Sequence, residues 1–177
     1  MTDEQLVDGC VKNERFAQQL FYQKFAGKMM GVCLRYAQSR DEAQDILQES
    51  FIKIFDKIQT FSGKGSLEGW VRRIVVNQAL DNYRKNKAHK KNLDISDYEY
   101  QIQTDEKIMD SFAARDLLKV IQKLPTGFRT VFNLYAIEGF SHKEIAKKLD
   151  ISESTSKSQY SRARSHLQSM LKSEKLY

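Results

Sequence analysis

The segment SHKEIAKKLDISESTSKSQYSRARSHLQSML, residues 141–171, decides the fold of this chain. Ser141 and Glu144 have the spacing of a capping box, in which each side chain bonds the backbone N–H of the other residue where a helix begins. Asp150 ends that short helix in a tight turn, because Asp tolerates a left-handed backbone better than most non-glycine residues. Ser152 can cap a second, longer helix. The segment therefore predicts a helix-turn-helix.

The longer helix of this segment divides into two faces. One face is expected to pack inward, and it holds Ser156, Tyr160, Ala163 and Leu167. The other face is polar and carries no acid, so it can hydrogen-bond base edges, and it holds Thr155, Ser158, Gln159 and Arg162. The residues beside it that can reach phosphates are Lys157, Ser161 and Arg164. An ordinary helical hairpin with a solvated basic face is the alternative. The capping box, the turn and the acid-free face together favour DNA.

Ser156 does not fit the apolar character of the inward face. A buried hydroxyl needs a hydrogen-bond partner, and the candidate is a backbone carbonyl one turn back on the same helix.

The rest of the chain also favours helices. Its 177 residues include 8 glycines and a single proline, Pro125, whereas strand-rich folds need many turns. Apolar residues recur at helical spacing from about Glu14 to Tyr36, in a stripe that starts at Phe16, and again from Asp41 and from Leu67.

A change of character begins near Asn86. The following stretch to Asp110 is rich in charge and weakly periodic, which is typical of a flexible linker. The sequence therefore predicts an all-α fold with two helical domains, residues 1–90 and 111–177, joined by a flexible linker over residues 91–110.

Several classes of protein are disfavoured. No run of eighteen apolar residues occurs, so no membrane insertion is expected, and the acidic N-terminus has no signal-peptide stretch, which indicates a cytoplasmic protein. Cys10 and Cys33 lie on apolar helical stretches and are read as buried small hydrophobes. The three histidines lack metal-ligand spacing, and neither a Gly-rich phosphate loop nor a nucleophile–base pair is present. We expect no enzyme, no metal and no cofactor.

The charge distribution indicates two kinds of partner. The formal charge is +6, and basic residues gather over 72–91 and 143–175, whereas residues 41–49 are acidic. In the first basic stretch, Arg72, Arg73, Asn77 and Arg84 share an amphipathic helix behind Trp70, and the loop before that helix offers Phe61 and Ser62. Aromatic rings beside cations suit single-stranded bases. Core packing of Trp70 and Phe61 is the alternative, as is a solvated helix start for the acidic segment.

Three stretches carry a family resemblance. DEAQDILQESFIK, residues 41–53, resembles the core-polymerase-binding segment of bacterial sigma factors. GWVRRIVVNQALDNYR, residues 69–84, resembles the promoter-melting helix of the extracytoplasmic-function group of these factors. Residues 124–134, 138–141 and 161–164 resemble the C-terminal domain of that group. The resemblance covers nearly the whole chain, in the right order.

The resemblance implies a two-domain promoter-recognition subunit. Asp45, Gln48 and Glu49 are then expected to contact a coiled coil of core RNA polymerase. The loop Phe61–Ser66, with Arg73 and Asn77, is expected to capture bases of the melted −10 element. The residues expected at the −35 duplex are Lys157, Ser158, Gln159, Ser161 and Arg162. An anti-sigma factor is an expected partner, and the free chain is expected to be a monomer.

Three residues depart from the pattern of that group. It commonly has a glycine where Asp150 stands, a valine or similar residue at Ser156, and a basic residue at Gln159. These departures bear on which −35 sequence is preferred.

Two other functions stay open at this point. A stand-alone helix-turn-helix regulator would use its N-terminal helices to dimerise or to sense a ligand, and would bind duplex DNA tightly by itself. An adaptor would bind proteins and carry its basic faces incidentally.

Overall fold

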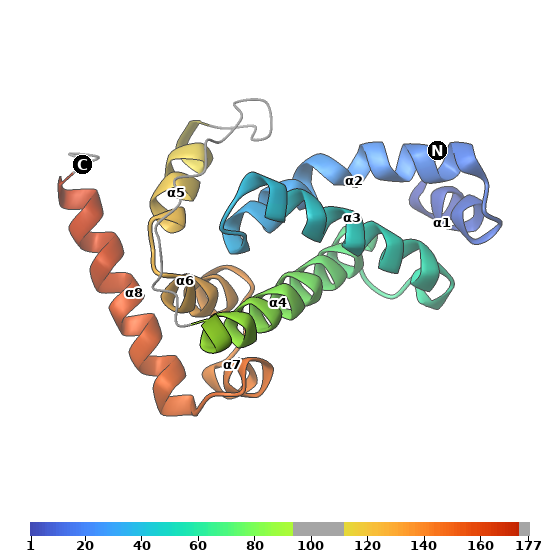
Figure 1. Ribbon diagram of the computed structural model, residues 1–177. Helices are drawn as coiled ribbons and strands as arrows, with labels where there is room; N and C mark the ends of the chain where they lie inside the picture. Colours follow the sequence, from blue (N-terminus) through green and yellow to red (C-terminus); the bar gives the residue numbers. More distant parts are fainter. Residues whose placement is uncertain (94–111, 174–177) are drawn as a thin grey trace.

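The computed structural model describes residues 1–93 and 112–173, and the regular elements in these ranges are all helical (Figure 1). The N-terminal half consists of α1 (Asp3–Val11), α2 (Arg15–Tyr36), α3 (Arg40–Lys57), the 3-10 turn η1 (Ile58–Thr60) and α4 (Leu67–Leu93). The C-terminal half consists of α5 (Phe112–Gln122), α6 (Thr126–Phe132), the π-helical turn η3 (Asn133–Ile137), α7 (His142–Leu149) and α8 (Glu153–Ser173). The predicted all-α fold is confirmed.

The helix α1 contains the apolar helical stretch that the sequence predicted around Cys10. It begins with a capping box, in which Thr2 Oγ1 accepts a hydrogen bond from the backbone N–H of Gln5 and the Gln5 side chain accepts one from the N–H of Thr2. α1 then packs on the start of α2, where Gly9 comes so close to Ala17 that a Cβ on Gly9 would lie 2.5 Å from that of Ala17.

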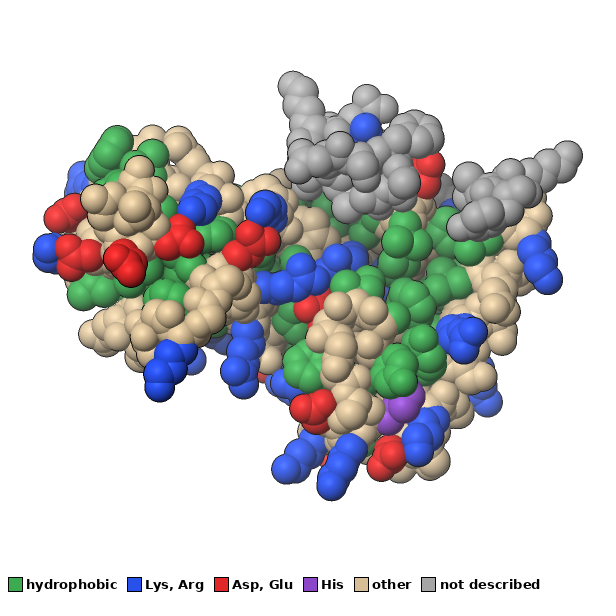
Figure 2. Space-filling model, turned by 180° about the vertical axis from the view of Figure 1, so that it is seen from behind, with side chains coloured by type: hydrophobic (Ala, Val, Ile, Leu, Met, Phe, Trp, Pro, Cys, Tyr) green, Lys and Arg blue, Asp and Glu red, His purple; other side chains and the backbone are tan. Residues whose placement is uncertain are grey.

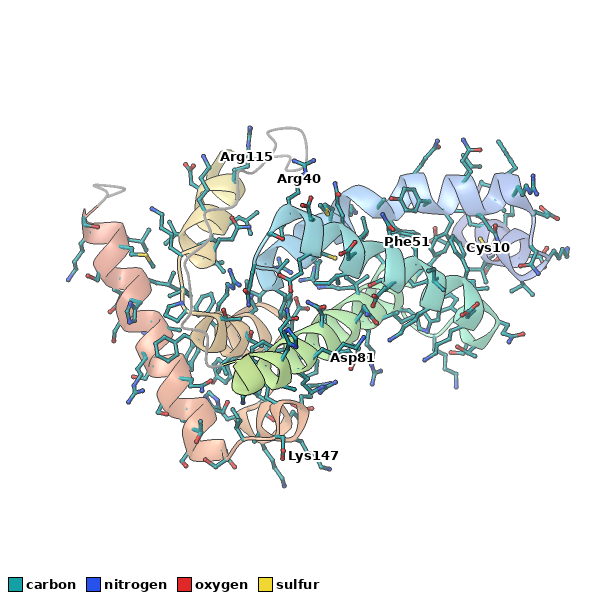
Figure 3. All side chains as sticks on the ribbon, viewed as in Figure 1. Cys10, Arg40, Phe51, Asp81, Arg115 and Lys147 are labelled. Carbon is teal, nitrogen blue, oxygen red and sulfur yellow. The ribbon has the colours of Figure 1, made fainter. Side chains whose placement is uncertain are left out.

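This packing corrects the expectation for Phe16. Ala17, not Phe16, takes the inward position at the start of α2, and Phe16 is 67% exposed. The aromatic core begins one turn later. Phe21 and Phe25 are buried with their ring centroids 4.8 Å apart, and Phe51 of α3 lies against α2 beside them (Figure 3).

The helix α4 is longer than the sequence suggested. It continues to Leu93, although the change of character near Asn86 was expected to end regular structure. Lys and Ala are strong helix formers, and an exposed helical extension needs no apolar stripe. Residues 91–93 of the predicted linker are therefore helical, and residues 94–110 lie outside the described part of the chain.

The two halves are packed together. Leu118, Val131, Leu134, Ile145 and Leu149 of the C-terminal half belong to the same continuous hydrophobic cluster as the core of α2, α3 and α4. Figure 1 shows α4 reaching α6 and α7, with α8 on the outer side. A second cluster, which includes Val120, Ile121 and Leu167, fastens α8 to α5.

Candidate nucleic-acid interface

The predicted helix-turn-helix is present as α7 and α8. Ser141 Oγ accepts from the backbone N–H of Glu144 at 3.3 Å, and the Glu144 carboxylate accepts from the N–H of Ser141 at 2.8 Å. The carboxylate also accepts from Ser141 Oγ at 2.8 Å. The bonds that it accepts from the backbone N–H and the hydroxyl of Ser141 hold the pKa of Glu144 below its ordinary value. Asp150 ends α7 in the left-handed conformation, at φ 53° and ψ 52°. Ser152 Oγ then accepts from the N–H of Thr155 at 3.0 Å and caps α8. Capping box, turn and second cap are all confirmed.

The inward face of α8 is also confirmed. The Ser156 hydroxyl on this face has a different hydrogen-bond partner from the one that was expected. Ser156, Ala163 and Leu167 are buried. Ser156 Oγ lies 2.9 Å from Nδ1 of His142, so its partner is a ring on α7 and not a carbonyl one turn back. The His142 ring stacks on Tyr135 of η3 at a centroid distance of 4.3 Å. This contact joins α7 and α8 to the turn before them.

The outward face of α8 is basic and polar. No acid occurs from Ser154 to Ser173. On α8, the exposed residues among those predicted to contact DNA are Lys157, Ser158, Ser161, Arg162 and Arg164. The exposed lysines Lys143 and Lys147 add to this charge from α7, and the labelled Lys147 points away from α4 (Figure 3). Figure 2 shows Lys and Arg side chains along the lower rim of the lobe that holds α7.

Two predicted DNA contacts on α8 are partly covered. Thr155 is half-buried and its Oγ1 lies 2.7 Å from Ser152 Oγ. Gln159 is half-buried beside Gly127 of α6, where a Cβ would lie 3.9 Å from the Gln159 amide and 3.8 Å from Oη of Tyr83 on α4. Gln159 thus packs beside α6, and Gly127 separates it from Tyr83.

The loop before α4 presents an aromatic pair. The ring centroids of Phe61 and Trp70 are 5.6 Å apart, and both residues are half-buried against the core cluster. Part of each ring therefore packs in the core, and the rest of each ring is exposed. Ser62 is exposed, and the loop turns at Gly63 and Gly65, whose φ values of 72° and 88° favour glycine.

The polar residues of α4 divide into open and engaged groups. Arg73 and Asn77 are exposed. Arg72 instead donates two hydrogen bonds to the carboxylate of Glu138, from Nε and Nη2, each 2.8 Å long. Arg84 donates to the carbonyl of Lys148 on α7 and pairs with Asp81, both at 2.5 Å. Arg72 and Arg84, which the sequence placed on the helix suited to single-stranded DNA, are therefore held by other groups of the chain.

The acidic segment forms the outer surface of α3. Asp45, Gln48 and Glu49 are exposed on one face, and Glu49 also accepts a hydrogen bond from Gln78. Glu42 differs, because its carboxylate accepts hydrogen bonds from Asn82 and Asn86 of α4. Glu42 therefore fixes α3 to α4, whereas the other three residues form an exposed surface, in which Glu49 is also bonded to Gln78.

The residues at the junction of the halves were not anticipated as a group. Gln122, Arg129, Asn133 and Glu138 all reach the N-terminal half. The sequence around each of them does not indicate such a contact, because a lone charged or amide residue in a helix is usually solvated. The contacts become visible only when the two halves, whose bonded residues lie up to about a hundred positions apart, are seen packed together.

Within residues 1–93 and 112–173, no group of three or more His, Cys, Asp or Glu side chains is placed to hold a metal ion. No helix in these same ranges combines the length and apolar character needed to cross a bilayer.

Comparison with known protein families gives two matches. A family model described as "Sigma-70 region 2" matches residues 21–89, and one described as "Sigma-70, region 4" matches residues 114–167. Together they cover more than half of the chain.

Curated relatives and solved structures agree with these matches. The chain is 28% identical to the ECF RNA polymerase sigma-E factor of Haemophilus influenzae, over 97% of this chain and 96% of the relative. It is 29% identical to the RNA polymerase sigma-H factor of Pseudomonas aeruginosa, over 92% and 90%. In fold it resembles the sigma factor RpoE in complex with the anti-sigma factor NepR from Bartonella quintana, at a TM-score of 0.57 and 23% identity, over 87% of this chain and 96% of that one. It also resembles CnrH in complex with the cytosolic domain of CnrY, at a TM-score of 0.52 and 20% identity, over 97% of each chain.

Proposed function

This chain belongs to the extracytoplasmic-function group of sigma-70 factors, which direct promoter-specific transcription initiation by RNA polymerase, and we propose how its surfaces divide that task. Residues 1–90 form the domain that binds core polymerase and opens the −10 element. Residues 111–177 form the domain that reads the −35 element, and residues 91–110 link them. The proposed role is that of a non-catalytic initiation factor, which acts in the cytoplasm and is a monomer until it meets polymerase.

The −35 duplex is read by α8. The observation that carries this assignment is a helix whose outward face holds Arg162 and Ser158 and no acid from Ser154 to Ser173, behind a capped turn. Arg and Ser side chains can bond base edges in the major groove, and Lys157, Ser161 and Arg164 can hold phosphates. Thr155 and Gln159, which are both half-buried, complete the reading face.

The melted −10 element is captured by the loop Phe61–Ser66 and by α4. Phe61 and Trp70 offer ring surface, and the exposed Arg73 and Asn77 lie on the helix that follows. Extruding a base from the duplex costs a few kcal/mol. Stacking on an aromatic ring returns about 1–3 kcal/mol per base. Cationic contacts with phosphates, including those of Arg72 and Arg84, supply the remainder.

Core polymerase is bound by the exposed face of α3 that holds Asp45, Gln48 and Glu49. These residues lie one turn apart or less, so they form a single acidic and polar patch. An anti-sigma factor is proposed as a second partner. The proposal draws on the solved relative RpoE, which is in complex with the anti-sigma factor NepR.

Reconstituted transcription tests this assignment. Bacterial core polymerase is combined with the wild-type chain or with Asp45→Ala, Gln48→Ala or Glu49→Ala, and both core binding and promoter-dependent transcript are measured. We expect each substitution to weaken core binding and to lower transcript in proportion. Asp56→Ala is the matched control, because Asp56 is an exposed acid on α3, about 10 Å beyond Glu49. Equal behaviour of the three variants and the control would place the polymerase contact elsewhere.

A further inference from the structure

The C-terminal half supplies the hydrogen bonds that end α2. The last carbonyls of a helix have no partner within the helix. Here three consecutive carbonyls accept from side chains of the C-terminal half. The carbonyl of Leu34 accepts from Gln122 at 3.0 Å, that of Arg35 from Asn133 at 2.8 Å, and that of Tyr36 from Arg129 at 3.4 Å.

These donors are built into the fold. Asn133 and Arg129 are 0% and 3% exposed. A buried Arg or Asn side chain is costly unless it is hydrogen-bonded. The two residues therefore require α2 in place, just as α2 requires them.

Beside this cap, one carboxylate joins three helical segments. Glu138 accepts two parallel hydrogen bonds from Arg72 of α4 and one from Arg35 of α2 at 3.1 Å, and its side chain is only 8% exposed. Burial and the neighbouring Arg72 charge lower the pKa of Arg35, and Glu138 opposes this effect. Glu138 thus supplies the negative charge that lets two guanidinium groups lie side by side.

The π-helical turn η3 brings the cap and the carboxylate to the same side. In an α-helix, the side chains of two residues that are five positions apart point in directions about 140° apart. In η3 the backbone N–H of Glu138 bonds the carbonyl of Asn133 at 2.9 Å, which closes a wider turn. As a result, Asn133 and Glu138 both face α2 and both bond Arg35. Turns of this kind recur at functional positions in helices.

The closed arrangement covers groups that the proposed function needs. Arg72 donates two parallel guanidinium hydrogen bonds to Glu138, and a bidentate contact with a phosphate would require the same two donors. Arg84 is bound to the carbonyl of Lys148. Two of the residues assigned to promoter DNA are therefore occupied in one conformation, while Asp45, Gln48 and Glu49 stay exposed.

We propose that Glu138 closes the free protein on itself, and that this closed form withholds Arg72 and Arg84 from DNA until the two halves separate. The closure rests on the contacts of α2, α4 and η3 alone. The withholding rests in addition on the proposed function of these two arginines. Opening exchanges the Glu138 carboxylate for nucleic-acid phosphate at Arg72.

Small-angle X-ray scattering of the full-length chain, without polymerase or DNA, tests the closure. A compact chain of this length has a radius of gyration of about 16 Å, and separation of the halves in Glu138→Gln should raise the measured value by about a fifth. Glu4→Gln is the control, because it removes the same charge from an exposed position on α1. Wild type and Glu4→Gln should match the closed structure. An already extended wild type, or a Glu138→Gln chain as compact as the wild type, overturns the closure.

A second variant guards against a failure of folding. The helical circular dichroism of Glu138→Gln is compared with that of the wild type. If it is lost, Gln122→Ala is used instead, since it removes one cap of α2 without changing charge. A smaller expansion with intact helicity supports the closure, and an unchanged radius overturns it.

Binding of a dye-labelled single-stranded oligonucleotide tests the withholding separately. Fluorescence anisotropy should show tighter binding by Glu138→Gln than by the wild type, with Glu4→Gln unchanged. An opened Glu138→Gln chain with unaltered affinity would overturn the withholding and leave the closure intact. Promoter-dependent transcription by the wild type does not depend on whether the closure or the withholding is overturned. The proposed function is therefore tested separately.

Discussion

The buried hydroxyl of Ser156 lies 2.9 Å from Nδ1 of His142, so one hydrogen bond joins the two helices of the helix-turn-helix. The His142 ring is fixed from its other side by Tyr135, on which it stacks. Because Ser156 is fully buried, water cannot replace the hydroxyl at this bond. The orientation of α8 relative to α7 therefore depends on a polar contact inside an otherwise apolar face.

Replacing Ser156 by Ala should destabilise the protein. Loss of the hydroxyl leaves the His142 nitrogen without its partner, so the free energy of unfolding should fall by about 1–2 kcal/mol. Urea denaturation followed by circular dichroism measures it. Ser169→Ala, an exposed change on the same helix, should stay within about 0.5 kcal/mol. A Ser156→Ala effect as small as that would show that the hydrogen bond contributes nothing.

Asp150→Gly should stabilise the turn between α7 and α8. Asp150 has a φ of 53°, a conformation that costs L residues about 1–2 kcal/mol, and glycine relieves this cost at the expense of chain entropy. We expect a net gain of about 0.5 kcal/mol in thermal unfolding. Lys147→Gly, at an exposed helical position of α7, should instead cost about 1 kcal/mol. The same sign for both variants would mean that the left-handed conformation is not strained.

Arg162→Ala should weaken binding to the −35 duplex. A loss of about 1–3 kcal/mol confined to the preferred sequence is expected if Arg162 reads a base. Electrophoretic mobility shifts with the polymerase-bound protein, on preferred and altered duplexes, measure it. Lys172→Ala removes a charge near the far end of α8 and serves as control. An equal loss on every duplex would make Arg162 a phosphate contact.

Stability should fall above pH 9 partly because of Cys33. Burial raises the pKa of this thiol to about 12 from its ordinary 9.0. The unfolded chain therefore releases the proton first, so the stabilisation is complete below pH 9 and declines as pH rises towards 12. Cys33→Ala should show a shallower decline in denaturation midpoint between pH 9 and 11. Parallel profiles for the two proteins would contradict the shift.

Local signals in the sequence predicted the parts of the molecule that depend on neighbours along the chain. Ser141 with Glu144, Asp150 and Ser152 specify caps and a turn through bonds within four residues, and each was found as expected. The exposed positions of Asp45, Gln48 and Glu49 follow from the helical period of α3 in the same way.

The parts that were missed depend on partners far along the chain. Phe16 is exposed because α1 approaches Ala17, which no periodicity of α2 reveals. Arg72 was expected to be open, but Glu138 lies 66 positions away and reaches it only after the two halves pack. The π-helical turn that places Glu138 has no signature in NLYAI, the sequence of residues 133–137.

The π-helical turn η3 constrains the number of residues between Asn133 and Glu138 more than it constrains which residues they are. Removing one residue between Asn133 and Glu138 would let an ordinary α-helical turn span them, with Glu138 still facing α2, whereas one added residue could not be absorbed in the same way. Everything after the added residue would then rotate by about 100° about the helix axis. The individual helices would survive, but α8 would face a different direction. Substitutions in this stretch should therefore be tolerated far better than a single-residue insertion, because the number of residues in the turn fixes the direction of the proposed DNA-reading helix.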